Sequence, residues 1–200
     1  MVEREDDTNV INGTWAFKCK RFPNGTVKKF KARFCARGDQ QLEGIDFFDT
    51  YAPIVQWTTV RLMLILENLL GLKSKQADVT AAFLHATLEK DEEVYVEMPL
   101  GFKQRGSNGK FKVLCLKKTL YGLSQSPLAF WKFLMEKLSN CGLPQAPFDP
   151  CNFIGKKVIA ICYVDDLIFW ARNEKDIVEL AVQLCAERID LSKRMMLPDS

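Results

Sequence analysis

Two adjacent acidic residues, Asp165 and Asp166, stand between two apolar stretches at residues 158–162 and 167–170. An apolar stretch, an acidic break and a second apolar stretch predict two β-strands joined by a tight turn. Such a turn would present both carboxylates at the end of a sheet. Because close carboxylates repel each other, a bound divalent cation is one way to keep both ionised. Asp-Asp pairs also occur in ordinary hairpin turns, so this pair alone allows either interpretation.

A third acid, Asp78, lies at the end of a predicted strand, residues 73–79, and precedes a predicted short helix, residues 80–87. Ligands commonly bind at the carboxyl ends of strands in open sheets. Three acids from two strands could therefore hold two metal ions. The single histidine, His85, could also ligate a metal, but a lone histidine on a helix surface is more often structural.

A basic segment precedes these acids. Eight Lys and Arg residues and no acid lie between positions 18 and 37, although the net charge of the whole chain is only +3. Alternate positions of a strand share one face, and here they include Lys31, Arg33 and Arg37. Residues 15–21 are the predicted partner strand, and Asn24-Gly25 is a hairpin turn signal. The pattern predicts a basic hairpin that covers phosphates, with a solvated hairpin surface as the alternative.

Apolar periodicity and end signals predict the other elements. Three helices are expected at residues 58–70, 126–140 and 173–189, and short strands at residues 94–97 and 111–116. The first helix is expected to be buried, capped by threonines and ended by Gly71. The second opens with Ser126-Pro127, and Asn173 is the expected cap of the third.

Composition indicates a soluble globular protein. The 200 residues, 48% of them hydrophobic, are enough for one large or two small domains. The longest apolar-rich stretch, residues 62–72, is too short to cross a bilayer, and no targeting segment or membrane partner is expected. Seven cysteines without C-x-x-C spacing argue against a zinc site or a disulfide framework and favour a reducing, intracellular compartment.

Five motifs follow one another along the chain: Lys31-Ala32-Arg33 with Ala36-Arg37-Gly38, Tyr51-Ala52-Pro53, Asp78-Val79-Thr80-Ala81-Ala82-Phe83-Leu84, Leu120-Tyr121-Gly122-Leu123 and Tyr163-Val164-Asp165-Asp166. In this order they resemble the reverse transcriptase domain of Ty1/copia-type retrotransposon polyproteins. The resemblance implies an α+β fold with fingers and palm, an antiparallel palm sheet packed on helices, and no thumb. It also implies an irregular lead-in at residues 1–14, a core at residues 15–191 and a truncated, divergent tail at residues 192–200.

The resemblance further implies an RNA-directed DNA polymerase that adds deoxynucleotides to a primer 3′-hydroxyl on an RNA or DNA template. Asp78, Asp165 and Asp166 would hold two Mg²⁺ ions, or Mn²⁺ in their place, with help from the main-chain carbonyl of Val79. In such two-metal sites the ions orient the attacking oxygen and stabilise the leaving pyrophosphate. The family's chain would be part of a longer polyprotein in the cytoplasm, or in a virus-like particle.

Other positions match nucleotide-binding residues of the family: Lys31, Arg33, Arg37, Phe83 and Gly122. The three basic residues would close on the triphosphate, and the aromatic ring would exclude a ribose 2′-hydroxyl by its volume. An ordinary core aromatic is the alternative for Phe83. The glycine would allow close backbone approach to the nucleotide, or simply form a turn that leads into a helix. Tyr163 and Val164 would position the turn and the primer.

One segment departs from the family pattern. Residues 124–128, Ser-Gln-Ser-Pro-Leu, carry serine and leucine where the pattern usually has lysine and arginine. A catalytically inactive retrotransposon remnant that only binds nucleic acid is an alternative, because the resemblance implies no thumb to grip primer and template. A magnesium-dependent phosphoacceptor domain is a weaker alternative. In this chain the single Asp comes first and the Asp pair last, which is opposite to the order in that class.

Overall fold

The computed structural model describes residues 1–192 of the chain, which divides into two compact units. The hairpin unit comprises residues 1–50 and 86–129. The sheet unit comprises residues 51–85 and the chain from residue 130 onward. Apart from Ser192, the tail predicted at residues 192–200 lies outside the described residues.

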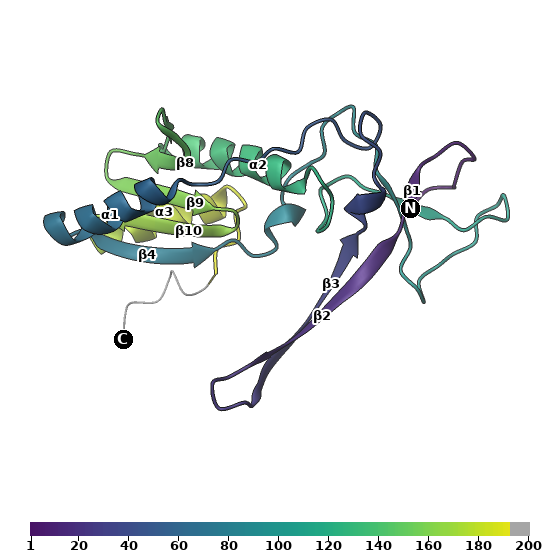
Figure 1. The fold of residues 1–200 in the computed structure, drawn as a ribbon, viewed down its shortest axis with the longest axis horizontal. Coiled ribbons are helices and arrows are strands. Elements are labelled where there is room, and N and C mark those ends of the chain that lie inside the picture. The colour runs from purple at the N-terminus through teal and green to yellow at the C-terminus, as the bar shows by residue number, and fades with distance from the viewer. Residues whose placement is uncertain (193–200) are drawn as a thin grey trace. The chain divides into compact units, whose positions relative to one another are not determined.

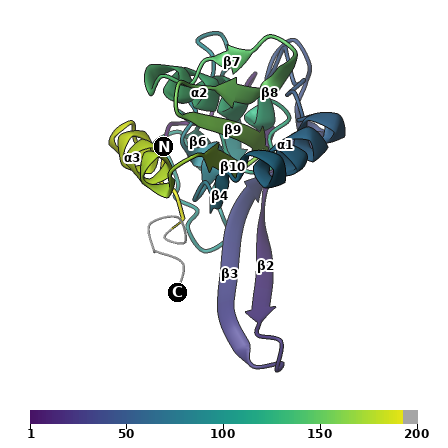
Figure 2. The ribbon, with the colours of Figure 1, turned by 90° about the vertical axis from the view of Figure 1, so that its left-hand side faces the viewer.

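The sheet unit is built on a five-stranded antiparallel sheet with the order β4-β10-β9-β8-β7. Its strands are β4 Lys73–Asp78, β7 Gln145–Ala146, β8 Asp149–Ile154, β9 Val158–Tyr163 and β10 Asp166–Ala171. Its helices are α1 Trp57–Leu70, α2 Ser126–Asn140, of which residues 130–140 belong to this unit, and α3 Glu174–Ala186. Figure 2 shows α1 on one face of the sheet and α3 on the other. The predicted α+β class is confirmed, with antiparallel strands packed on helices.

Helix α1 is buried on one side only, so the prediction of a buried helix was wrong. Its buried residues are Thr59 and Met63, and Met63 packs with Trp170 in a core cluster of the sheet unit. By contrast, Ile65 is 56% exposed and Leu69 is 74% exposed. Apolar residues surround this helix, but only the side that faces the sheet can be covered.

The N-terminus of α1 is capped from a distant part of the chain. Gln56 is the N-cap residue, and its own side chain does not cap the helix. Instead Oδ2 of Asp149 accepts hydrogen bonds from the Gln56 backbone N–H at 3.1 Å and from the Thr59 hydroxyl at 2.6 Å. The predicted threonine cap is therefore wrong, whereas the predicted end at Gly71 is confirmed by its left-handed φ of 62°.

Helix α2 has the predicted bounds, whereas α3 and the short helix after β4 are shorter than predicted. Helix α3 ends at Ala186 instead of residue 189, and Arg188 has a left-handed φ of 68°. The helix predicted at residues 80–87 is only a 3-10 helix, Ala82–Leu84. Ala81 has a φ of 54°, and a left-handed residue cannot continue an α-helix.

In the hairpin unit, β2 Gly13–Arg21 and β3 Val27–Ala36 form the long antiparallel hairpin that the sequence predicts (Figure 1). The backbone N–H of Gly25 donates to the Phe22 carbonyl at 2.9 Å. Pro23 and Asn24 are therefore the central residues of the turn, and Gly25 follows with a φ of 85°. A 3-10 helix, Gly38–Gln40, comes shortly after β3.

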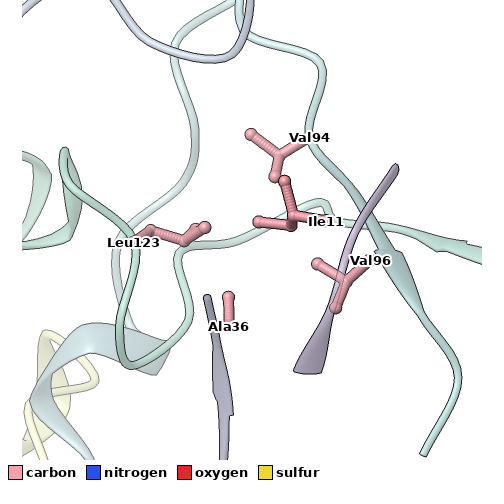
Figure 3. Close-up of a cluster of buried hydrophobic side chains, with 5 residues drawn as sticks. All are labelled: Ile11, Ala36, Val94, Val96 and Leu123. Carbon is pink, nitrogen blue, oxygen red and sulfur yellow. The ribbon is translucent and has the colours of Figure 1, made fainter. Parts of the chain in front are cut away.

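A second small sheet holds the base of this hairpin. It contains β1 Val10–Ile11, β5 Tyr95–Glu97 and β6 Val113–Cys115 in the order β1-β5-β6. A buried cluster joins Ile11, Ala36, Val94, Val96 and Leu123 (Figure 3). The lead-in expected to be irregular thus contains a short strand, because Ile11 belongs to this core.

Two predictions from composition concern membranes and cysteines. No helix within residues 1–192 is long and apolar enough to cross a membrane. All seven cysteines are free thiols.

The distant cap predicts the effect of a substitution at Asp149, whose side chain is fully buried. Asp149→Ala should lower the free energy of unfolding by about 2–3 kcal/mol, because it leaves buried donors without an acceptor. Urea denaturation followed by circular dichroism measures this value. Asp91→Ala, at an exposed carboxylate, is the control, and equal effects of the two substitutions would contradict the capping role.

Candidate active site

The two predicted apolar strands are β9 and β10, and a two-residue turn, Val164-Asp165, joins them. Val164 has a φ of 58°, a conformation that is rare for a β-branched residue. A positive φ at the first central position is typical of a type II′ hairpin turn. The sequence indicates the turn through its acids, but it gives no sign that the strained residue is the valine.

Hydrogen bonds from two sides hold this turn. The Cys162 thiol donates to the Val164 carbonyl at 3.2 Å, and the Asp165 carbonyl accepts a hydrogen bond from the Val79 N–H at 2.9 Å. Burial raises the pKa of the Cys162 thiol, and the neighbouring Cys151, Asp165 and Asp166 raise it further. The thiol therefore stays protonated and acts as a hydrogen-bond donor at neutral pH.

Asp78 and Asp166 lie directly opposite each other on neighbouring strands. The register pairs Asp166 of β10 with Asp78 of β4 on one side and with Tyr163 of β9 on the other. Side chains at opposed positions of an antiparallel pair have Cβ atoms about 4.5–5.5 Å apart. The structure thus brings Asp78, Asp166 and the turn residue Asp165 to the same end of the sheet, as expected.

The carboxylates do not form a closed cage in this arrangement. Within residues 1–192, no three His, Cys, Asp or Glu side chains lie at a spacing that could hold a metal ion. Asp165 and Asp166 are half-buried and Asp78 is exposed. The side-chain oxygens of all three are the hard donors that Mg²⁺ and Mn²⁺ prefer, so the donor chemistry fits such ions.

Two residues that were not predicted from the sequence form hydrogen bonds with these acids. Gln76 of β4 donates from Nε2 to Oδ1 of Asp166 at 3.4 Å. Ser192 donates its backbone N–H to the Asp78 carbonyl at 2.9 Å, and its hydroxyl accepts from the Asp78 N–H at 3.2 Å. Gln76 could have been noticed, because it shares a strand face with Asp78. Ser192 could not, because it lies 114 residues from Asp78.

Phe83 and His85 both pack on aromatic residues of α2. The ring of Phe83 is half-buried and meets Phe130 edge-on, with ring centroids 6.0 Å apart. The ring of His85 stacks on Phe133 at 5.9 Å, and its Nε2 lies 2.9 Å from the Thr80 carbonyl oxygen. These contacts give His85 a structural role. For Phe83 they fit a core aromatic with a partly exposed side chain.

The predicted phosphate-binding residues belong to the hairpin unit. Lys31 and Arg33 lie on one face of β3, as expected, and Arg37 follows the strand. The Arg33 guanidinium lies over the Tyr121 ring, 5.1 Å from its centroid. Arg37 forms a 2.6 Å salt bridge with Asp39, which raises the pKa of Arg37 and lowers that of Asp39.

Gly122 has a structural reason to be glycine. Its φ is 92°, and a Cβ at this position would lie 2.1 Å from the Ala36 carbonyl oxygen. Around it, Ala36 donates its N–H to the Tyr121 carbonyl at 2.7 Å and Gly38 donates to the Gly122 carbonyl at 3.1 Å. The approach to a nucleotide that the resemblance implies stays a prediction. Within this unit, the backbone at Gly122 closely approaches the end of β3.

This approach predicts that Gly122→Ala destabilises the hairpin unit by about 2–4 kcal/mol, from left-handed strain plus the clash with Ala36. Gly44→Ala is a matched control, because Gly44 has a φ of 80° but no atom lies within 4 Å of the position that a Cβ would take there. The control should lower the stability by only about 1 kcal/mol. Thermal unfolding of both variants measures the difference, and similar effects would show that the clash is unimportant.

Known proteins share this sequence pattern over nearly the whole chain. The chain matches the family described as "Reverse transcriptase (RNA-dependent DNA polymerase)" over residues 1–196. It is 32% identical over 204 residues to the Retrovirus-related Pol polyprotein from transposon TNT 1-94 of Nicotiana tabacum, covering 100% of this chain and 14% of that polyprotein.

Two further transposon polyproteins are similar to this chain. The Retrovirus-related Pol polyprotein from transposon RE1 of Arabidopsis thaliana is 32% identical over 163 residues, covering 80% of this chain and 11% of the relative. The Transposon Ty1-H Gag-Pol polyprotein of Saccharomyces cerevisiae is 33% identical over 198 residues, covering 94% of this chain and 10% of the relative. The chain thus spans only a small part of each relative's length. It belongs to the reverse transcriptase family, in the form carried by the Pol polyproteins of Ty1/copia-type transposons.

Proposed function

We propose that this chain is the catalytic core of an RNA-directed DNA polymerase that adds deoxynucleotides to a primer 3′-hydroxyl. One observation carries the proposal: Asp78 lies directly opposite Asp166 at the sheet end where Asp165 forms the turn. Like charges at opposed positions destabilise an antiparallel pair. A site that uses all three carboxylates to hold cations gives this costly arrangement a purpose.

Asp78, Asp165 and Asp166 would hold two Mg²⁺ or Mn²⁺ ions, with the Val79 carbonyl as a further ligand. When bound, such ions orient the attacking hydroxyl and stabilise the charge that develops on the transferred phosphate. The chain's own residues would fix the ligands beforehand. Gln76 orients the Asp166 carboxylate, and Ser192 holds the backbone of Asp78 on both sides.

The hairpin unit would correspond to the fingers and the sheet unit to the palm. Lys31, Arg33 and Arg37 would supply positive charge to the triphosphate, and charged donors form the stronger hydrogen bonds to phosphate. Gly122 would keep the backbone near the nucleotide free of a side chain. Tyr163, which is 53% exposed, and Val164, which is 38% exposed, would position the primer end.

The substrates in this proposal are deoxynucleoside triphosphates and an RNA or DNA template with its primer. Three relatives are named as Pol or Gag-Pol polyproteins, so we propose that this chain also acts as part of a longer polyprotein. The seven free thiols are compatible with a reducing intracellular compartment as its place of action.

Nucleic-acid binding without catalysis is the second candidate function. It is favoured by the open arrangement of the carboxylates, because no three metal-ligating side chains within residues 1–192 are already gathered. In that case the hairpin unit would retain its affinity for phosphates while primer extension is missing.

Primer extension separates these two functions. The chain should extend a primed RNA template with deoxynucleotides and Mg²⁺, and Asp165→Asn should reduce the rate about 100-fold or more, because a neutral amide is a weaker ligand for a hard cation. Asp91→Asn, at an exposed acid in the hairpin unit, should keep the rate. Retained template binding without extension, in either Mg²⁺ or Mn²⁺, would favour the binding-only function.

Sugar selection tests the role of Phe83. Phe83→Val should raise the incorporation of ribonucleotides relative to deoxynucleotides about 10-fold or more, because a smaller side chain leaves room for the 2′-hydroxyl. Single-nucleotide incorporation kinetics measure this ratio. Phe83→Leu is the control for the Phe130 contact, since it keeps more of the apolar volume. A drop in melting temperature without a change in sugar selection would leave Phe83 a core residue.

A further inference from the structure

The β2–β3 hairpin has two chemically different faces. Alternate cross-strand pairs of a ribbon point to opposite sides. On one side the pairs are Trp15 with Phe34, Phe17 with Ala32 and Cys19 with Phe30. On the other side they are Ala16 with Arg33, Lys18 with Lys31 and Lys20 with Lys29. We call these the aromatic face and the basic face.

The aromatic face is largely exposed. Phe17 is 76% exposed, Phe30 75% and Trp15 42%. Trp15 stacks on Phe17 with ring centroids 6.0 Å apart and packs on Phe34 at 5.4 Å. Phe34 in turn packs against the buried cluster of the hairpin unit. The row of rings therefore starts at the core and continues along the hairpin. An exposed apolar patch of this kind marks an interaction site.

Charge decides which partner fits. Residues 13–36 contain seven Lys and Arg residues and no Asp or Glu. Two copies that stacked their aromatic faces would bring two such hairpins together, and their like charges would oppose the contact. A polyanion with flat apolar surfaces can contact the aromatic face and also bind the lysines of the basic face. A nucleic-acid strand without a complement has this chemistry, since its bases are open to stacking, whereas a duplex keeps its bases stacked inside.

The ribbon is narrow enough for both faces to act on one strand. It is only two strands wide, about 5 Å between strand axes, so both of its edges are open beyond the base at Ala36. Lysine side chains are long and can bend over an edge while their stems stay on the ribbon. The exposed Lys18, Lys20 and Lys29 can thus reach the phosphates of a strand whose bases lie on the aromatic face.

We propose that the aromatic face of the hairpin is a stacking platform for the bases of an unpaired nucleic-acid strand, with Trp15, Phe17 and Phe30 as the stacking side chains. The inference deepens the proposed function, on which it rests for the identity of that strand as the unpaired part of the template. The binding itself requires neither metal ions nor catalysis.

The test uses the full chain with fluorescein-labelled oligonucleotides, and fluorescence anisotropy measures affinity without metal ions or nucleotides. The probes are a single-stranded DNA, a single-stranded RNA and a blunt DNA duplex of the same sequence. The double variant Phe17→Leu/Phe30→Leu keeps apolar side chains but removes both exposed rings. Its affinity for the single strands should fall about 10- to 100-fold, with little change for the duplex.

Lys20→Gln/Lys29→Gln is the matched control on the basic face. It should weaken single strands and duplex alike and reduce the slope of log K against log salt by about 0.7–0.9 for each phosphate that the variant no longer neutralises. An equal drop in affinity for single strand and duplex in the phenylalanine variant, or no drop at all, would overturn the stacking role. So would sedimentation that shows the parent chain to dimerise and this variant to be a monomer.

Failure of this inference is distinguishable from failure of the proposed function. A chain that does not extend primers can still show the loss of single-strand affinity on removal of the rings, which supports the platform by itself. A chain that extends primers but binds single strands equally well without the rings retains the polymerase proposal and refutes the platform. Circular dichroism of each variant confirms that the exposed substitutions leave the fold intact.

Discussion

The pairing of β4 with β10 is the constraint on which the site depends. A slip of one residue would turn every side chain of the strand to the opposite face and would separate Asp78 from Asp166. The register is held by burial on the other face, where Leu167 and Phe169 are fully buried. Two opposed carboxylates do not stabilise the strand pair. Apolar packing elsewhere on the same strands therefore holds them opposite each other.

The turn next to these acids shows the same dependence on its surroundings. A left-handed valine costs free energy, of order 1–3 kcal/mol, and persists only where neighbouring contacts determine the conformation. The Cys162 thiol and the Val79 N–H provide those contacts by binding the carbonyls of Val164 and Asp165. The strained Val164 and the hydrogen bonds that stabilise it thus lie in one turn, next to the acids of the proposed active site.

The β2–β3 hairpin needs support from the rest of its unit, because a two-stranded ribbon is at best marginally stable by itself. Its base is held by the buried Ala36 and by backbone hydrogen bonds to the loop around Gly122. The ribbon beyond that base has no second layer within its own unit, and its aromatic rings remain exposed. A fold built only for stability would not keep Phe17 and Phe30 in water, which is why a partner is the natural explanation for them.

Local features could be predicted from the sequence: the strands and turn around Asp165, the bounds of α2, the hairpin that turns near Gly25 and the motifs that indicate the family. These follow from periodicity and turn chemistry, which neighbouring residues determine. Other features became visible only in the folded chain: which side of α1 is covered, the capping of α1 by Asp149, the hydrogen bonds between Ser192 and Asp78, and the close approach of Gly122 to Ala36. Each of these depends on residues far apart in the chain, whose contact no local pattern encodes.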